Sequence, residues 1–319
     1  MFKSLFTSNP AKYWLQTLVV LAICMILVLL YKRQNLAPYY EGFTQSSKFV
    51  LKQNADIYDD FYVDIYDRLM LPDQRCAFET AKIVEMTFPT KQHSVFLDIG
   101  SGTGHLVKQL YDRGYTVYAI DQSPTMVARV NERVPDAHVK CGNAMEPMVY
   151  DRNSFTHVLC TGLTIYHFPN KFDFLRNCYF WLMPGGYLVI HLVDRDRFDT
   201  IVPGGKPPLL KSPQKYAKQR ITDTIIDFVD FEYKASYKFD DTEGKSGQRR
   251  VTFLETFTDE LTKNVRQNET TMYMEDVRTI LQMAAQCGFL VQGMATMGEC
   301  GDEYQYLYIL ERPQSNILL

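Results

Sequence analysis

The feature that most constrains the fold of this 319-residue chain is a glycine-rich loop between an apolar segment and a helical pattern. Residues 95–97 are typical of a buried strand, and Asp98 follows where that strand would end. Glycines then occupy every second position of residues 100–104, where backbone N–H groups can approach a ligand because no Cβ intervenes. Apolar residues recur at helical spacing over 106–111. The segment predicts a strand, a ligand-binding loop and a helix, with Asp98 placed to accept a hydrogen bond from the ligand.

The spacing of these glycines separates the loop from two other nucleotide-binding loops. A phosphate loop needs Gly-x4-Gly-Lys-Ser/Thr, and the required lysine is missing here. A dinucleotide loop needs Gly-x-Gly-x-x-Gly, whereas residues 100–104 supply Gly-x-Gly-x-Gly. The alternative is a tight turn that binds no ligand. The segments that follow decide between a ligand-binding loop and such a turn.

The second strand adds an acidic group to the predicted site. Residues 116–120 are typical of a strand, and Asp121 stands at its tip, where a carboxylate can accept hydrogen bonds from both hydroxyls of a ribose. Ser123 and Pro124 then predict a helix start, with the serine as N-cap and the proline at the first helical position. Met126 begins the apolar face of that helix.

Three more predicted strands follow along the chain. Residues 142–144 (Gly-Asn-Ala) follow a third strand, and residues 161–168 follow a fourth. Residues 183–186 (Met-Pro-Gly-Gly) predict a turn before a fifth strand at 187–192. Strands that alternate with helical patterns predict a parallel sheet of the α/β class.

Over residues 95–193, these motifs resemble in kind and order those of class I S-adenosylmethionine-dependent methyltransferases. The family's first motif is Asp/Glu-x-Gly-x-Gly-x-Gly, and a Leu/Met-Pro-Gly-Gly turn before the fifth strand is another of its hallmarks. The resemblance implies a doubly wound, mostly parallel seven-stranded sheet of Rossmann-like topology. It also implies an enzyme whose cofactor is S-adenosyl-L-methionine.

The resemblance further implies which residues surround this cofactor. The expected cofactor-binding residues are Asp98, Gly100, Ser101, Gly102, Gly104, Asp121, Gln122, Met126, Asn143, Ala144 and Thr161. Asn143 departs from the family's pattern, because an Asp usually contacts the adenine amino group from this position. The side-chain carbonyl of Asn143 can still accept that bond.

Methyl transfer from a sulfonium is an in-line displacement, so the protein mainly aligns the acceptor and removes a proton from an N–H or O–H nucleophile. His167 follows the fourth strand, at the rim toward which the cofactor's methyl group would point. It is a candidate base or substrate hydrogen-bond partner, with Tyr166 as the second candidate; a polar rim residue without a catalytic role is the alternative. His191, in an apolar strand, is expected to be buried and hydrogen-bonded. A metal site at His191 is not expected. Side chains alternate between the two faces of a strand, so the acidic residues that are near His191 in sequence are scattered in space.

The N-terminal part of the chain carries a different signal. Residues 14–31 form an 18-residue apolar run with only two polar interruptions and aromatic residues at both ends. As a helix the run would reach about 27 Å, close to the hydrocarbon thickness of a bilayer. It predicts a transmembrane helix between a tail at 1–13 and a linker at 32–55. A cleaved signal peptide is the alternative, although no Ala-x-Ala-type site follows.

Charge and cysteine content bear on location and partners. More Lys and Arg follow the apolar run than precede it, which favours a cytoplasmic catalytic domain. The seven cysteines include no CxxC pair, and Cys141 and Cys160 are expected to be reduced core residues. The net charge is −3, and the first 33 residues hold four basic and no acidic residues, which leaves −7 on the remainder. A nucleic-acid partner is therefore not expected.

The methyltransferase domain is expected over 56–312, followed by a tail at 313–319. At its start, residues 57–67 place aromatic side chains at helical spacing, and this helix either folds over the cofactor or only packs on the domain. Alternating segments within about 220–274 predict a three-stranded antiparallel insertion that caps the active site. Two antiparallel strands are expected near the C-terminus.

These features predict a membrane-anchored methyltransferase that acts on an N or O atom of a small molecule. The layout is similar to that of deoxysugar amine N-methyltransferases. Three alternatives stay open: an inactive cofactor-binding module that tethers a partner at the membrane, a lipid or protein methyltransferase, and a nucleotide-dependent dehydrogenase on the same sheet. The sequence does not indicate the acceptor or the oligomeric state.

Overall fold

The computed structural model describes four stretches of the chain, residues 10–34, 47–206, 212–240 and 249–314. The chain divides into two compact units, residues 1–41 and 42–319. The end of the predicted C-terminal tail and the turn expected between two cap strands lie outside the described residues.

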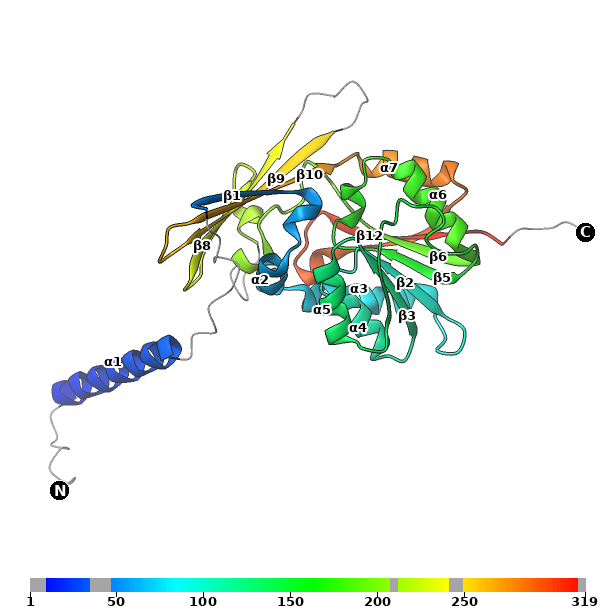
Figure 1. Cartoon of the computed structure of the whole chain (residues 1–319). Coiled ribbons are helices and arrows are strands. Elements are labelled where there is room, and N and C mark those ends of the chain that lie inside the picture. The colour runs from blue at the N-terminus through cyan, green and yellow to red at the C-terminus, as the bar shows by residue number, and fades with distance from the viewer. Residues whose placement is uncertain (1–9, 35–46, 207–211, 241–248, 315–319) are drawn as a thin grey trace, which may run out of the picture. The chain divides into compact units, whose positions relative to one another are not determined.

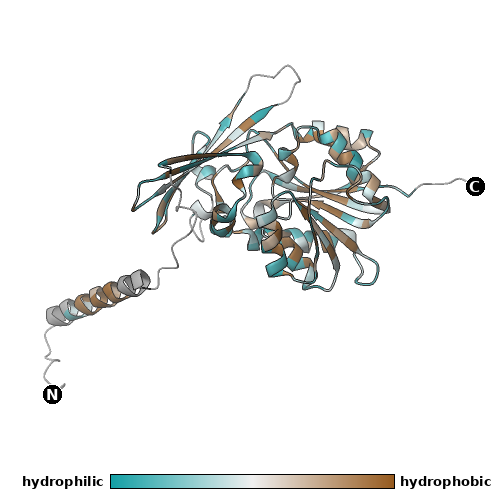
Figure 2. Ribbon diagram, in the orientation of Figure 1, coloured by the Kyte–Doolittle hydropathy of each residue, from teal (hydrophilic) through white to brown (hydrophobic). Residues whose placement is uncertain are grey.

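The described part of the first unit is helix α1 (Pro10–Gln34), which covers the whole predicted apolar run. Its side chains are described at Trp14 and over 16–27, and Figure 2 shows apolar residues along this part. Among the described residues, no helix is long and apolar enough to cross a membrane. The predicted transmembrane helix is therefore not supported by the structure.

The second unit is built on a seven-stranded sheet with the order β11-β12-β6-β5-β2-β3-β4. Its strands are β2 (Val95–Ile99), β3 (Thr116–Asp121), β4 (His138–Cys141), β5 (Phe155–Cys160), β6 (Leu182–Val193), β11 (Leu290–Thr296) and β12 (Gln305–Glu311). Neighbouring strands are parallel except in the two pairs that β12 makes. The predicted doubly wound, mostly parallel sheet and its terminal antiparallel strands are confirmed.

Helices cover both faces of this sheet (Figure 1). On one face lie α3 (Pro72–Thr87), α4 (His105–Tyr111) and α5 (Pro124–Arg133), and on the other lie α6 (Lys171–Trp181) and α7 (Val277–Gln286). The first face holds an apolar core in which Ile83, Leu106 and Val130 from the helices join Phe96 from β2. Ser123 caps α5 as predicted, because its Oγ accepts a hydrogen bond from the Met126 N–H (3.1 Å).

A second, five-stranded sheet forms the cap, with the order β1-β10-β9-β8-β7. Its strands are β1 (Phe49–Gln53), β7 (Asp223–Asp227), β8 (Phe231–Phe239), β9 (Arg250–Asp259) and β10 (Val265–Tyr273). Two predictions are corrected here: the insertion supplies four strands rather than three, and β1 belongs to the segment predicted as a linker. β1 pairs in parallel with β10, with Phe49 opposite Val265. A five-residue edge strand with so distant a partner leaves little pattern in the sequence.

Helix α2 (Asp60–Met70) connects the cap to the main sheet. Alternate residues of β9 and β10 are buried on the inner face of the cap, where the Phe61 and Phe257 rings meet edge to face with centroids 5.3 Å apart. Short 3-10 turns complete the unit: η2 (Asn54–Ile57), η3 (Thr164–His167), η4 (Pro203–Gly205), η5 (Pro213–Tyr216) and η6 (Met297–Cys300).

Two local predictions are also corrected. The Met-Pro-Gly-Gly segment lies inside β6 rather than before it, at an irregularity in the pairing with β5. Gly185 has φ +78° there, and its N–H donates to the Arg312 carbonyl (2.7 Å). Cys141 is exposed, because β4 is an edge strand, whereas Cys160 is buried as predicted.

Candidate functional site

A cavity of about 370 Å³ lies at the carboxyl ends of the parallel strands, within the size range of small-molecule sites. Strands β2 and β5 are neighbours, and the helices that follow them, α4 and α6, cover opposite faces of the sheet. The two connecting loops therefore diverge and leave a crevice between them. Residues of η2 and β10 also line the cavity, so the cap helps to close it.

The glycine loop forms one wall of this first cavity. Gly100 and Gly102 have φ of +66° and +53°, a region that favours glycine. A Cβ on Gly100 would lie 2.5 Å from Thr164 Cγ2, so no larger residue fits there without a shift. The Gly102 N–H donates to Asp121 Oδ2 (2.9 Å). The loop and the end of β3 therefore hold each other in place.

Asp121 lines the cavity and has hydrogen-bonding capacity to spare. Its Oδ1 accepts from the Ser123 N–H (2.9 Å), and its Oδ2 accepts from Gly102. Burial raises the pKa of this carboxyl, while the backbone N–H groups of Ser123, Gly102 and Gln122 oppose that rise. Each carboxylate oxygen has two lone pairs, so each can accept one more hydrogen bond. Two such acceptors match the two hydroxyls of a ribose.

The structure brings together about half of the predicted site residues. The cavity wall contains Gly100, Gly102, Asp121, Gln122, Met126, Ala144 and His167. The residues predicted for the site that do not line the cavity are Asp98, Ser101, Gly104, Asn143, Thr161 and Tyr166.

Three of these departures have clear physical reasons. Asp98 is buried behind the loop, and burial, followed by the negative charges of Glu79 and Asp121, raises its pKa well above the ordinary value. Asn143 Oδ1 accepts from the Met145 N–H (2.9 Å), so the carbonyl predicted to contact adenine already has a partner. Tyr166 is buried, and its Oη accepts from the Val193 N–H (2.9 Å), which indicates a structural role.

His167 lies at the end of η3, where the first cavity meets a second one of about 120 Å³. Its side chain is exposed, because it opens into both cavities, while the protein atoms packed around these cavities withdraw it from bulk water. This desolvation, with a smaller effect of the nearby Lys171 charge, lowers the pKa of His167 to about 4. The ring is therefore neutral at pH 7, with one nitrogen able to accept a hydrogen bond and the other able to donate one.

The second cavity lies between the main sheet, α2 and the cap. It shares Tyr58, Tyr66 and Gly162, as well as His167, with the first cavity. His191 from β6 also lines it and is buried, as predicted. The expectation that His191 is fully hydrogen-bonded is wrong: neither ring nitrogen has a bond of standard geometry among the described residues.

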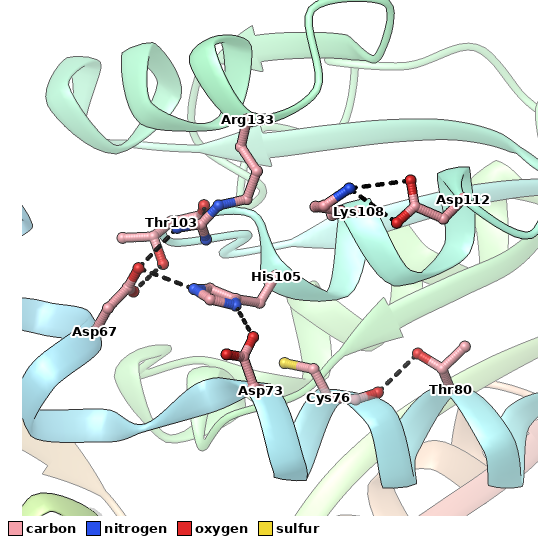
Figure 3. Close-up of polar contacts among 9 residues, drawn as sticks. All are labelled: Asp67, Asp73, Cys76, Thr80, Thr103, His105, Lys108, Asp112 and Arg133. Atoms are coloured by element: carbon pink, nitrogen blue, oxygen red, sulfur yellow. Dashed lines mark hydrogen bonds and ion pairs between the residues drawn. The ribbon is translucent and has the colours of Figure 1, made fainter.

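Figure 3 shows how α2 is fixed beside the glycine loop. The Asp67 carboxylate accepts from Thr103 Oγ1 (2.6 Å) and Arg133 Nη2 (2.7 Å), and lies 2.9 Å from His105 Nε2. Burial acts to raise the pKa of Asp67, but hydrogen bonds from these three residues outweigh it and hold that pKa well below its usual range. His105 Nδ1 also lies 2.5 Å from Asp73 Oδ1. These contacts hold α2, the helix that carries most of the aromatic side chains of residues 57–67, against the glycine loop over the cavity.

Sequence reasoning missed the polar residues of the second cavity. Those with charged or amide side chains are Arg75, Asp199, Lys206, Asp302 and Gln305. Each comes from a different segment, and none belongs to a motif with its neighbours. Only the tertiary structure, which brings them together around one cavity, identifies them as a group.

Comparisons with known proteins agree with this geometry. Residues 97–190 match the protein family described as "Methyltransferase domain". A malonyl-[acyl-carrier protein] O-methyltransferase of Marinomonas sp. (strain MWYL1) is 28% identical over 192 residues, which are 59% of this chain. The match spans 58% of that relative's length, somewhat over half.

Two solved structures share the fold. The CcbJ methyltransferase from Streptomyces caelestis has a TM-score of 0.59 at 15% identity, over 80% of this chain and 98% of that one. An amino pentose methyltransferase from Micromonospora echinaspora, solved with S-adenosylmethionine bound, has a TM-score of 0.52 at 15% identity, over 75% of this chain and 91% of that one. The chain therefore contains a methyltransferase domain with the class I fold, and S-adenosylmethionine is the cofactor of that class.

Proposed function

We propose that the protein is an S-adenosylmethionine-dependent methyltransferase that methylates an N or O atom of a small molecule. The observation that carries this proposal is the junction of two cavities at His167. The first cavity is bounded by the glycine loop and Asp121, and the second by α2 and the cap. Methyl transfer requires a donor and an acceptor that meet in one enclosed space, and this arrangement provides it.

The residues of the first cavity fit the cofactor. Gly100 and Gly102 leave their backbone open to the cavity, and Asp121 offers an unused acceptor site on each oxygen. Met126 and Ala144 supply apolar surface for a purine ring. When bound there, S-adenosylmethionine supplies a methyl group activated by its sulfonium sulfur.

The chain's own residues then position the acceptor. His167, neutral at pH 7, accepts a hydrogen bond from the acceptor's N–H or O–H and so orients the lone pair that attacks. Tyr58 and Tyr66, which line both cavities, keep water from the junction.

Titration calorimetry with S-adenosylmethionine on the full chain tests the donor site. Asp121→Ala is expected to weaken binding at least about 100-fold, because two hydrogen bonds to a charged group, each about 1.5–3 kcal/mol, are lost. Asp121→Asn, which retains one acceptor oxygen, should fall between that variant and the wild type. Asp151→Ala, at an exposed carboxylate away from the cavity, is the matched control. Equal affinity in all four proteins, with circular dichroism confirming the fold, would overturn the assignment.

Membrane attachment through residues 14–31, with the catalytic unit in the cytoplasm, rests on the sequence alone and stays a prediction. Alkaline carbonate extraction of cells that express the full chain tests it. An inserted protein stays in the membrane pellet, whereas release into the supernatant contradicts insertion.

A further inference from the structure

The second cavity carries an unusual density of charge. Its wall holds the cations Arg75 and Lys206 and the carboxylates Asp199 and Asp302. Lys206 Nζ lies 3.2 Å from Asp199 Oδ2 and 3.4 Å from Asp302 Oδ1, so one ammonium serves two carboxylates. Arg75 Nε is 3.8 Å from Glu79 Oε1 behind the wall. Three carboxylates therefore meet two cations, which leaves an excess negative charge whenever Glu79 is ionised.

The ionisation of Glu79 depends on pH in the neutral range. Glu79 is fully buried, and burial raises its pKa to about 7, while the charge of Arg75 opposes the rise. The excess negative charge is therefore partial at pH 7 and complete above it.

Two polar groups in this wall have bonding capacity that the protein leaves unused. His191 is 1% exposed, and within the described part of the chain its ring nitrogens make no hydrogen bond of standard geometry, although Gln305 is a polar neighbour. Asp199 is 5% exposed, and its Oδ2 faces Lys206 but accepts no bond of standard geometry from any described residue. Buried polar atoms normally have partners, so unused ones in a cavity wall point to a polar ligand.

Six aromatic side chains also line this wall. Its rings belong to Tyr58, Tyr62, Tyr66, Phe198, Tyr237 and Phe253. Ring faces carry partial negative charge and attract cations. The rings and the carboxylates therefore favour the same kind of ligand, one that carries or develops positive charge.

We propose that the second cavity binds an amine as the methyl acceptor, an inference that rests on the proposed function. The amine lone pair forms the new N–C bond while the S–C bond of the sulfonium breaks, and the electron pair of that bond goes to sulfur, which becomes a neutral thioether. Positive charge moves from sulfur to nitrogen, and the methylated ammonium then loses a proton to water. Carboxylates and ring faces near the nitrogen stabilise this charge as it develops.

The same wall disfavours an acid as the acceptor. Lys206 is already paired with Asp199 and Asp302, and Arg75 is paired with Glu79, so a carboxylate anion would add negative charge where the cations are already engaged, and the ring faces would not attract it. At about 120 Å³, the cavity admits a small amine or the amine-bearing end of a larger molecule.

Amine blocking tests this inference with the full chain. Methyl-labelled S-adenosylmethionine is incubated with the enzyme and the small-molecule fraction of an extract from the source organism. The fraction is used untreated or after acylation of its amines with N-hydroxysuccinimidyl acetate. We expect base-stable labelled products from the untreated fraction and at least tenfold less label from the blocked one. Label that survives blocking, or that mild base releases as methanol, would overturn the amine inference. Cofactor binding without product from either fraction would instead overturn the proposed function.

A matched pair of variants tests the role of the wall. Asp199→Asn keeps the side-chain size and the oxygen that accepts from the Ile201 N–H (3.0 Å), but removes the charge. We expect at least a tenfold lower rate of label transfer with unchanged cofactor affinity. Asp227→Asn makes the same change at an exposed site on β7 and should leave the rate unchanged. A normal rate in Asp199→Asn, or an equal loss in both variants, would contradict the proposal.

Discussion

The two cavities are assembled in different ways. One wall of the first consists of backbone and short side chains in the loops that follow β2 and β3, and Asp121 is its single lining carboxylate, while residues of η2, α2 and β10 close the other side. The second is built from long side chains of α2, α3, the cap and the segments after β6 and η6. The cavity wall suited to a common donor thus comes from a local, repeating chain pattern, whereas the cavity suited to a specific acceptor comes from contacts distant in the sequence.

Gly100→Ala should break the first cavity, with the largest effect expected. The new Cβ would lie 2.5 Å from Thr164 Cγ2 at a φ of +66°. We expect cofactor affinity to fall at least about 100-fold, since an overpacked site costs about 1–3 kcal/mol in addition to backbone strain. Titration calorimetry measures the cofactor affinity, and urea unfolding measures the loss of stability caused by overpacking and backbone strain.

Gly301→Ala is the matched control for backbone strain alone. Gly301 has φ +91°, and a Cβ there would meet no described atom within 4 Å. The free energy of unfolding should fall by only about 1–2 kcal/mol, the cost of a left-handed residue, with unchanged cofactor affinity. Equal losses of affinity in the two variants would show that crowding at the loop is not what shapes the cavity.

His167→Ala tests the junction between the cavities. We expect kcat to fall about 100-fold with unchanged cofactor affinity, because a positioned hydrogen-bond or proton-transfer group is lost. Tyr166→Phe, the adjacent change, should leave kcat nearly normal but lower the free energy of unfolding by about 1 kcal/mol, since the Val193 N–H loses its acceptor. A near-normal kcat in His167→Ala would show that His167 is only a rim residue.

Glu255→Gln, a change in the cap strand β9, should have the smallest effect. It should alter only how the stability of the folded protein depends on pH. Glu255 Oε1 accepts from Tyr62 (3.0 Å) and Tyr233 (2.8 Å), and burial raises the pKa of Glu255 to about 7. The folded state thus keeps a proton that the unfolded chain releases near its ordinary pKa of about 4.3. Stability therefore declines as pH rises from about 5 to 7 and levels off above.

In Glu255→Gln this decline should be smaller, but not absent, because the pKa of Glu79 is raised in the same way. Melting temperatures between pH 5 and 8 measure it. Glu269→Gln, on the outer face of β10, is the control and should behave as the wild type. An unchanged slope in Glu255→Gln would contradict the assigned protonation.

Prediction from sequence succeeded where a structure depends on neighbours in the chain. The strand before Asp98, the cap at Ser123 and the acidic tip at Asp121 all follow from short patterns, and the structure confirms each element. It failed where a side chain could turn either way. Asp98 and Tyr166 lie beside the cavity wall in sequence, but packing directs them into the protein interior.

The sequence by itself determined the main sheet, the edge at which the first cavity lies and the presence of a cap, because periodicity and glycine spacing act over a few residues. Only the tertiary structure decided that β1 completes the cap, that His167 faces two cavities, and which side chains form the second one. Those features need segments from distant parts of the chain to pack together, and the burial and charge that result exist only after folding.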